Sequence, residues 1–202
     1  MKDELDSKKR ILDSAKILFA HKGFKGTSIR DIAKAANVNV SAINYYFQNK
    51  ENLFQELIRN SYHEINLSLD VIFNKNLKQN MEEFCLQVFD HLLSNQVQFF
   101  NTFKIYFSED DFLVSNALKD IFQGPPGINY FIKVWENQVE RSFNPQVDRW
   151  KLLAILSCLF HGVLVLHSPM TKIDTGERHY QIEKDDYRFT LQNLISLMTK
   201  KE

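Results

Sequence analysis

Side chains able to contact a nucleic acid are concentrated between residues 40 and 46. On a helix, successive residues are about 100° apart, so Ile43 and Phe47 share one apolar stripe and the other side chains point away from it. The outward side chains are small or polar: Ser41, Ala42, Tyr45 and Tyr46, with Val40 and Asn44 on the flank. Hydroxyl and amide groups beside a small Ala suit hydrogen bonds to base edges and phosphates. The alternative is the solvated face of an ordinary short helix.

Two short helices joined by a turn would position this face. In the first helix, Thr27 or Ser28 is the expected N-cap, and Asp31 completes a capping box with Ser28. Its apolar residues recur at helical spacing at Ile29, Ile32, Ala33 and Ala36. Asn37 tolerates the left-handed conformation of a turn, and Asn39 can cap the second helix. The pattern predicts a helix-turn-helix.

Charge is distributed unevenly along a chain whose formal net charge is zero. Residues 8–50 hold nine bases against Asp13 and Asp31, which gives a net charge of +7. The bases are Lys8, Lys9, Arg10, Lys16, Lys22, Lys25, Arg30, Lys34 and Lys50. A basic segment on an acidic remainder suits binding to a polyanion such as double-stranded DNA, although lysines on a solvated helix would give the same count.

Residues 8–58 resemble the DNA-binding domain of the TetR/AcrR family of transcriptional regulators. The resemblance rests on Arg10-Ile11-Leu12-Asp13-Ser14-Ala15, Leu18-Phe19-Ala20, Gly23-Phe24, Gly26-Thr27-Ser28-Ile29-Arg30-Asp31-Ile32-Ala33 and Tyr45-Tyr46-Phe47-Gln48-Asn49-Lys50-Glu51-Asn52-Leu53-Phe54. The chain departs from the family at Asn37, where Gly is usual, at Asn44, where Tyr is frequent, and at Tyr46, where His is frequent.

The resemblance implies roles for the side chains of this segment. Those implied to face bases are Val40, Ser41 and Asn44. Those implied to hold phosphates are Thr27, Tyr45, Tyr46 and Lys50, the last at a helix N-terminus where the dipole favours an anion. Ser28, Asn39 and Ala42 complete the expected DNA-binding surface.

The rest of the chain has a helical pattern throughout. Helices are expected at about 7–22, 49–72, 81–95, 97–108, 128–143, 146–167 and 184–200, with no repeat and no β pattern. We therefore expect an all-α protein of about nine helices. Residues 1–50 would form a three-helix, helix-turn-helix DNA-binding head, and residues 51–202 a helical regulatory, ligand-binding and dimerisation body.

Aromatic residues are frequent in the expected body. Fifteen lie between Phe84 and Phe160, and eleven of them are Phe. They could line a pocket for an apolar or aromatic ligand, or they could simply fill a core. The candidate ligand-binding residues are Phe99, Phe103, Tyr106, Phe107, Trp135 and His161.

The last two long helices are candidates for contact with a second subunit. The segment 150–166 is apolar on both faces, so it needs covering on both sides. The family resemblance likewise implies a homodimer through these helices, and a small-molecule effector in the body that changes the affinity for DNA.

Common enzyme sites are missing from the sequence. Gly124-Pro125-Pro126-Gly127 lacks the Lys-Ser/Thr that follows in a phosphate-binding loop, and neither a nucleophilic-serine turn nor a paired-histidine zinc motif is present. Cys85 and Cys158 lack metal-ligand spacing and are interpreted as reduced core residues. We expect no catalysis, no cofactor and no metal.

The N-terminal residues and the most apolar stretch of the chain indicate the cellular compartment in which we expect the protein. Residues 1–6 are polar, which predicts no signal peptide. Residues 152–166 are apolar but number about fifteen, which is short for a bilayer span and favours a buried helix. We therefore expect a cytoplasmic protein that does not enter a membrane.

The resulting hypothesis is a ligand-responsive repressor that binds a palindromic operator as a homodimer and is released by a small apolar or aromatic effector. One alternative is a nucleoid-type DNA-binding factor of the same family without such an effector. Another is a helical enzyme or lipid-binding module in which the helix-turn-helix is incidental.

Overall fold

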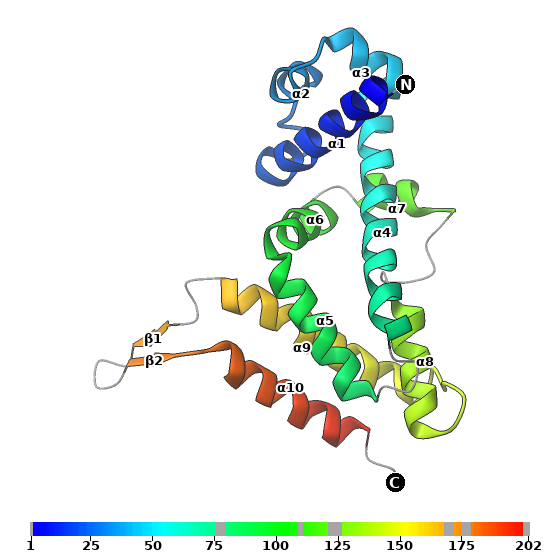
Figure 1. Ribbon diagram of the computed structural model, residues 1–202, viewed down its shortest axis with the longest axis vertical. Helices are drawn as coiled ribbons and strands as arrows, with labels where there is room; N and C mark the ends of the chain where they lie inside the picture. The colour runs from blue at the N-terminus through cyan, green and yellow to red at the C-terminus, as the bar shows by residue number, and fades with distance from the viewer. Residues whose placement is uncertain are drawn as a thin grey trace. The chain divides into compact units, whose positions relative to one another are not determined.

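The computed structural model describes residues 2–75, 80–108, 111–120, 127–167, 172–174 and 179–199 (Figure 1). Within these residues lie ten helices and one pair of short strands. The helices are α1 (Lys2–Lys22), α2 (Ile29–Ala36), α3 (Val40–Phe47), α4 (Lys50–Lys75), α5 (Met81–Ser94), α6 (Gln96–Ser108), α7 (Asp111–Leu118), α8 (Ile128–Val139), α9 (Asp148–His167) and α10 (Lys184–Met198). The predicted all-α class is confirmed.

One short helix and one pair of short strands were not predicted. α7 is a tenth helix of only eight residues, too short for its apolar spacing to stand out. The antiparallel strands β1 (Lys172–Asp174) and β2 (His179–Gln181) pair Ile173 with Tyr180 between two expected helices, where no helix or strand was expected. Strands of three residues cannot show the alternation by which a strand is recognised.

The chain divides into two compact units. Unit 1 comprises residues 1–65 and 97–126, and unit 2 comprises residues 66–96 and 127–202. α4 contributes residues to both units. The expected border at residue 50 separates DNA binding from regulation, and that functional division stays a prediction.

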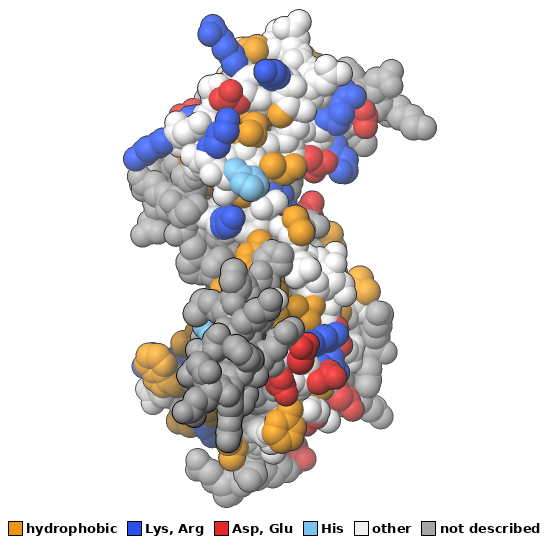
Figure 2. Space-filling view, turned by 90° about the vertical axis from the view of Figure 1, so that its left-hand side faces the viewer, with side chains coloured by type: hydrophobic (Ala, Val, Ile, Leu, Met, Phe, Trp, Pro, Cys, Tyr) orange, Lys and Arg blue, Asp and Glu red, His pale blue; other side chains and the backbone are white. Residues whose placement is uncertain are grey.

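Aromatic packing holds α1 and α4 together in unit 1. The rings of Phe19, Phe24 and Phe54 lie 5.2 to 5.7 Å apart, and Phe54 meets the other two edge to face. Each such pair adds roughly 0.5–1.5 kcal/mol beyond the burial of its area. Ile32 of α2 and Ile43 of α3 complete the same core. Figure 2 shows Lys and Arg side chains spread over the surface of α1 to α3.

α5 is the central helix of unit 2 and packs against α8, α9 and α10. Phe84 of α5 meets Phe131 of α8 at 4.8 Å, and Phe89 stacks on Tyr187 of α10 at 5.6 Å. Tyr187 also lies over Gly162 of α9, where an added Cβ would be 2.0 Å from its ring. The close approach of α9 and α10 therefore requires glycine at this position.

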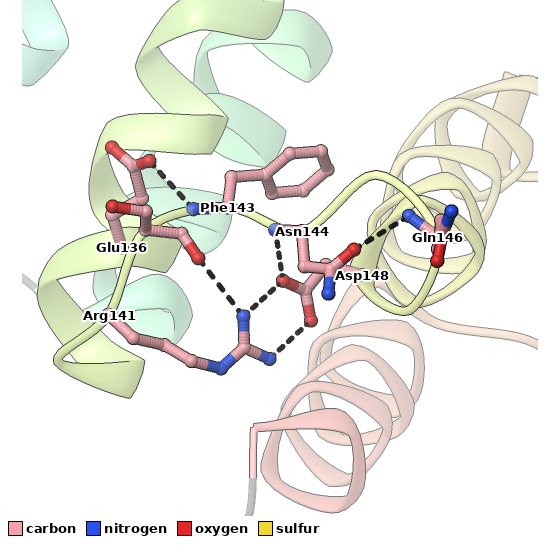
Figure 3. Close-up of polar contacts among 7 residues, drawn as sticks. Glu136, Arg141, Phe143, Asn144, Gln146 and Asp148 are labelled. Atoms are coloured by element: carbon pink, nitrogen blue, oxygen red, sulfur yellow. Dashed lines mark hydrogen bonds and ion pairs between the residues drawn. The ribbon is translucent and has the colours of Figure 1, made fainter.

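A polar network forms the connection between α8 and α9 (Figure 3). Arg141 donates two hydrogen bonds to the fully buried carboxylate of Asp148, at 2.6 and 2.7 Å, and the backbone N–H of Asn144 donates a third at 2.8 Å. The hydrogen bonds from Arg141 lower the pKa of Asp148 below its usual range, and burial opposes this shift. Asp148 is thus held as a carboxylate in the first turn of α9, where the helix dipole favours an anion.

α9 is longer than the fifteen-residue apolar stretch seen in the sequence. By length and composition its residues Asp148–Leu166 meet the criteria for a membrane-spanning helix, criteria that core helices of soluble proteins also meet. One side of α9 is buried within unit 2, including Leu152, Ile155 and Leu159. Its other side is exposed at Trp150, Leu153, Ser157 and His161, which follow one another at helical spacing.

Candidate nucleic-acid interface

The start of α2 has the capping box predicted from the sequence. The Ser28 hydroxyl accepts a hydrogen bond from the Asp31 backbone N–H at 3.1 Å, and the Asp31 carboxylate accepts one from the Ser28 backbone N–H at 3.0 Å. The hydrogen bonds from Ser28 lower the pKa of Asp31. Ser28 therefore fixes where α2 begins.

The turn after α2 also follows the prediction. Asn37 has φ 52° and ψ 52°, the left-handed conformation expected there. Asn39 is the N-cap residue of α3, but its side chain makes no capping hydrogen bond. The position of the cap was predicted correctly and the bond was not.

α3 buries the two residues expected to face inwards. Ile43 is fully buried and Phe47 nearly so. On its other side, Ser41, Asn44 and Tyr45 are exposed, and Tyr45 is the most exposed large apolar side chain described, at 76%. The half-buried residues are Val40, Ala42 and Tyr46. α3 thus presents hydroxyl, amide and phenol groups to solvent.

Thr27, which the family resemblance implies to hold a phosphate, is buried. Its side chain is only 2% exposed, and its hydroxyl lies 2.9 Å from the carbonyl oxygen of Gly23 and 3.3 Å from that of Leu18. The hydroxyl hydrogen is used inside the chain, so this side chain has a structural role here, and its expected phosphate contact stays a prediction.

Lys50 is also turned inwards. Its ammonium group donates hydrogen bonds to the backbone carbonyls of Phe24 at 2.9 Å and Thr27 at 3.0 Å, and it lies 4.2 Å from the centroid of the Phe24 ring. Two of the three N–H donors of the ammonium are therefore occupied by the turn between α1 and α2.

The nine bases of residues 8–50 fall into two groups. Five are engaged within the chain: Lys50 as described, and Lys8, Lys9, Arg10 and Lys16 in ion pairs with Glu56, Asp13, Asp6 and Glu64 at 2.7, 2.7, 3.3 and 3.6 Å. The other four are exposed, and no carboxylate of the described residues lies within ion-pair distance of them. We call these four the unpaired cations; they are Lys22, Lys25, Arg30 and Lys34.

The unpaired cations lie on the elements next to α3. Lys22 ends α1, Lys25 is in the turn that follows, and Arg30 and Lys34 are four residues apart on the exposed side of α2. Their charge is part of the +7 of residues 8–50, but no sequence pattern assigned them to the site. The signal was available in part, because Arg30 and Lys34 lie opposite the apolar stripe of α2.

The expected ligand-binding residues are only partly described. Trp135 is fully buried in unit 2, and Phe99 is half-buried in unit 1 beside Phe100. The side chains of Phe103, Tyr106 and Phe107 lie outside the described residues. His161 is exposed on α9, and its expected role in ligand binding stays a prediction.

Comparisons with known proteins agree on one family. Residues 11–57 match the family model described as bacterial regulatory proteins, tetR family. The chain is 39% identical over 93 residues to the probable HTH-type transcriptional regulator YttP of Bacillus subtilis, covering 46% of this chain and 45% of YttP. It is 29% identical over 101 residues to IcaR of Staphylococcus aureus, the negative transcriptional regulator of the biofilm operon icaADBC, covering 47% and 54%. The chain thus spans about half the length of these relatives.

A solved structure extends the fold comparison to nearly the whole chain. The transcriptional regulator FadR of Bacillus subtilis, in complex with stearoyl-CoA, superposes with a TM-score of 0.64 at 16% identity and covers 95% of this chain and 97% of that one. At this identity the similarity concerns the fold alone. With the helix-turn-helix geometry of α2 and α3, the match over residues 11–57 shows that this segment of the chain belongs to the TetR family of bacterial regulatory proteins.

Proposed function

We propose that the chain is a transcriptional repressor that binds a palindromic operator as a homodimer and leaves it when a small apolar or aromatic effector binds. In this proposal residues 1–50 bind DNA, and residues 51–202 bind the effector and form the dimer. The protein would act in the cytoplasm. The supporting observation is that the unpaired cations are exposed on α1, the turn after it and α2, that α1 and α2 pack against α3, and that α3 exposes polar side chains.

The division of labour at the interface follows from this arrangement. Val40, Ser41 and Asn44 lie among the first five residues of α3 and would enter the major groove. Tyr45 and Tyr46, with the unpaired cations, would contact the phosphates on either side. Repression agrees with the described role of IcaR as a negative regulator.

Dimerisation is supported by the exposed apolar side chains of α9 and α10. Trp150 and Leu153 of α9 are 64% and 45% exposed, and Phe189 and Leu197 of α10 are 66% and 65% exposed. The two helices pack against each other. Because these four side chains are exposed, each helix also has an apolar side that unit 2 does not cover. We define this set of four residues as the seam. Its contact with the same surface of a second chain would bury all four side chains.

The proposed effector is suggested by the aromatic content of the chain and by FadR, a TetR-fold regulator solved with stearoyl-CoA. That acyl thioester belongs to FadR. For this chain the proposal is limited to a small apolar or aromatic compound, because aromatic side chains bind such ligands by burying their surface.

Selection of bound sequences from a pool of random duplexes tests the proposal. A palindromic motif with half-sites about one helical turn apart is the expected result. An effector is then sought as a compound that lowers the affinity for the selected duplex. Recovery of dispersed fragments without a motif would instead indicate a nucleoid-type factor, and no recovery would rule out DNA binding by this chain.

A further inference from the structure

The first residue of α4 holds the turn between α1 and α2, which comprises residues 23–28. The Lys50 ammonium group donates to the carbonyls of Phe24 and Thr27, at 2.9 and 3.0 Å, and the Phe24 ring lies 4.2 Å away. Carbonyl dipoles and an aromatic face both attract a cation, so this site satisfies the ammonium without a carboxylate. One side chain therefore joins α4 to the segment that leads into α2.

The turn is itself closely constrained. Gly23 has φ 72°, and at Gly26 an added Cβ would lie 2.3 Å from the carbonyl oxygen of Lys22. The buried Thr27 hydroxyl donates to the Gly23 carbonyl at 2.9 Å. The turn ends at Ser28, the N-cap of α2. Lys50 thus binds a segment of fixed shape, and fixing that segment sets where α2 starts.

We propose that Lys50 is a positioning residue for DNA binding. It holds the turn against α4 and so orients α2 and α3. Its ammonium group binds the carbonyl oxygens of the turn and does not contact a phosphate. Lys34 offers the contrast within the same unit, because it is exposed and belongs to the unpaired cations. The proposal depends on DNA binding alone and does not require a dimer or an effector.

The salt dependence of DNA affinity separates the two roles. Each phosphate contact contributes about 0.9 to the slope of log affinity against log salt. Lys50→Met is expected to lower affinity about tenfold or more at every salt concentration and to leave the slope unchanged. The matched control Lys34→Met is expected to reduce the slope by about 0.9 for each bound subunit. Both are measured with a duplex selected from a random pool, at a temperature where circular dichroism shows the variants folded.

Two results would overturn the proposal: a slope reduced in Lys50→Met as in Lys34→Met, or an unchanged affinity. Amide hydrogen exchange adds a local measurement, since loss of the ammonium should speed exchange in α2 while the variant remains folded.

If Lys50→Met does not fold, amine-directed acetylation of the unaltered protein decides. Lys50 should react slowly without DNA, and Lys34 should become slow only with DNA; fast reaction of Lys50 in the free protein contradicts the proposal. Failure of every duplex to bind would instead refute the proposed function.

Discussion

Asn44 carries the sharpest expectation for base recognition. It is exposed on α3, and its amide can donate to and accept from the edge of one base. Asn44→Ala should relax the preference at one base pair and cost about 1–3 kcal/mol if that base is adenine. Selection from random duplexes measures the change, with Gln48→Ala, exposed just beyond α3, as the control. An unchanged motif would remove Asn44 from the base-reading residues.

Asp148 gives unit 2 a dependence on pH. Its folded pKa is lowered by Arg141, so its contribution to stability is present above the unfolded pKa of about 3.9 and is lost as pH falls through the folded value. Asp148→Asn should lower the free energy of unfolding at pH 7 by about 1–3 kcal/mol, because the hydrogen bonds that Arg141 and the Asn144 N–H donate to a buried carboxylate lose their charged acceptor. Urea denaturation should show this difference shrink below about pH 4. A difference independent of pH would mean that Asp148 acts through its shape alone.

The helices were largely predictable because their signals are local. The capping box of Ser28 and Asp31 spans four residues, and the apolar pair Ile43 and Phe47 is one helical turn apart. The site itself was predictable only in part. The Lys50 ammonium group donates a hydrogen bond to the carbonyl of Thr27, which lies 23 residues earlier in the sequence. No local pattern predicts that the side chain of the first residue of a helix will contact the loop that precedes an earlier helix. The net charge of +7 likewise does not show which basic side chains form ion pairs with carboxylates in the folded chain.

The seam on α9 and α10 can be tested with a single charge. Leu197→Glu should abolish the proposed dimer, because an unpaired carboxylate would be buried between the chains. Leu197 is a better choice than its neighbour Leu194, which is half-buried within the chain, so a charge at 194 would also disturb the fold. Light scattering measures the mass, and Val71→Glu, at an exposed apolar position on α4, is the control. A folded Leu197→Glu variant that remains dimeric would place the contact elsewhere.

The charge available to DNA is smaller than the sequence suggests. A dimer has eight unpaired cations, which sets the slope of log affinity against log salt at no steeper than about 7 from these residues. Counting all nine bases of each chain would give about 16. Titration of a selected duplex from low to moderate salt distinguishes the two values. A slope well above 7 would show that ion pairs such as Lys8–Glu56 open on the DNA.

Those ion pairs also affect how the protein would find its operator. Glu56 and Glu64 on α4 form ion pairs with Lys8 and Lys16, so a phosphate would have to displace them to bind these two lysines. A genome presents about 10⁶–10⁹ competing non-specific sites. A regulator with high non-specific affinity is therefore bound mostly to DNA away from its operator. Because the two carboxylates compete with any duplex for the same lysines, they weaken the sequence-independent part of binding, and the base contacts of α3 then supply a larger share of the free energy of operator binding.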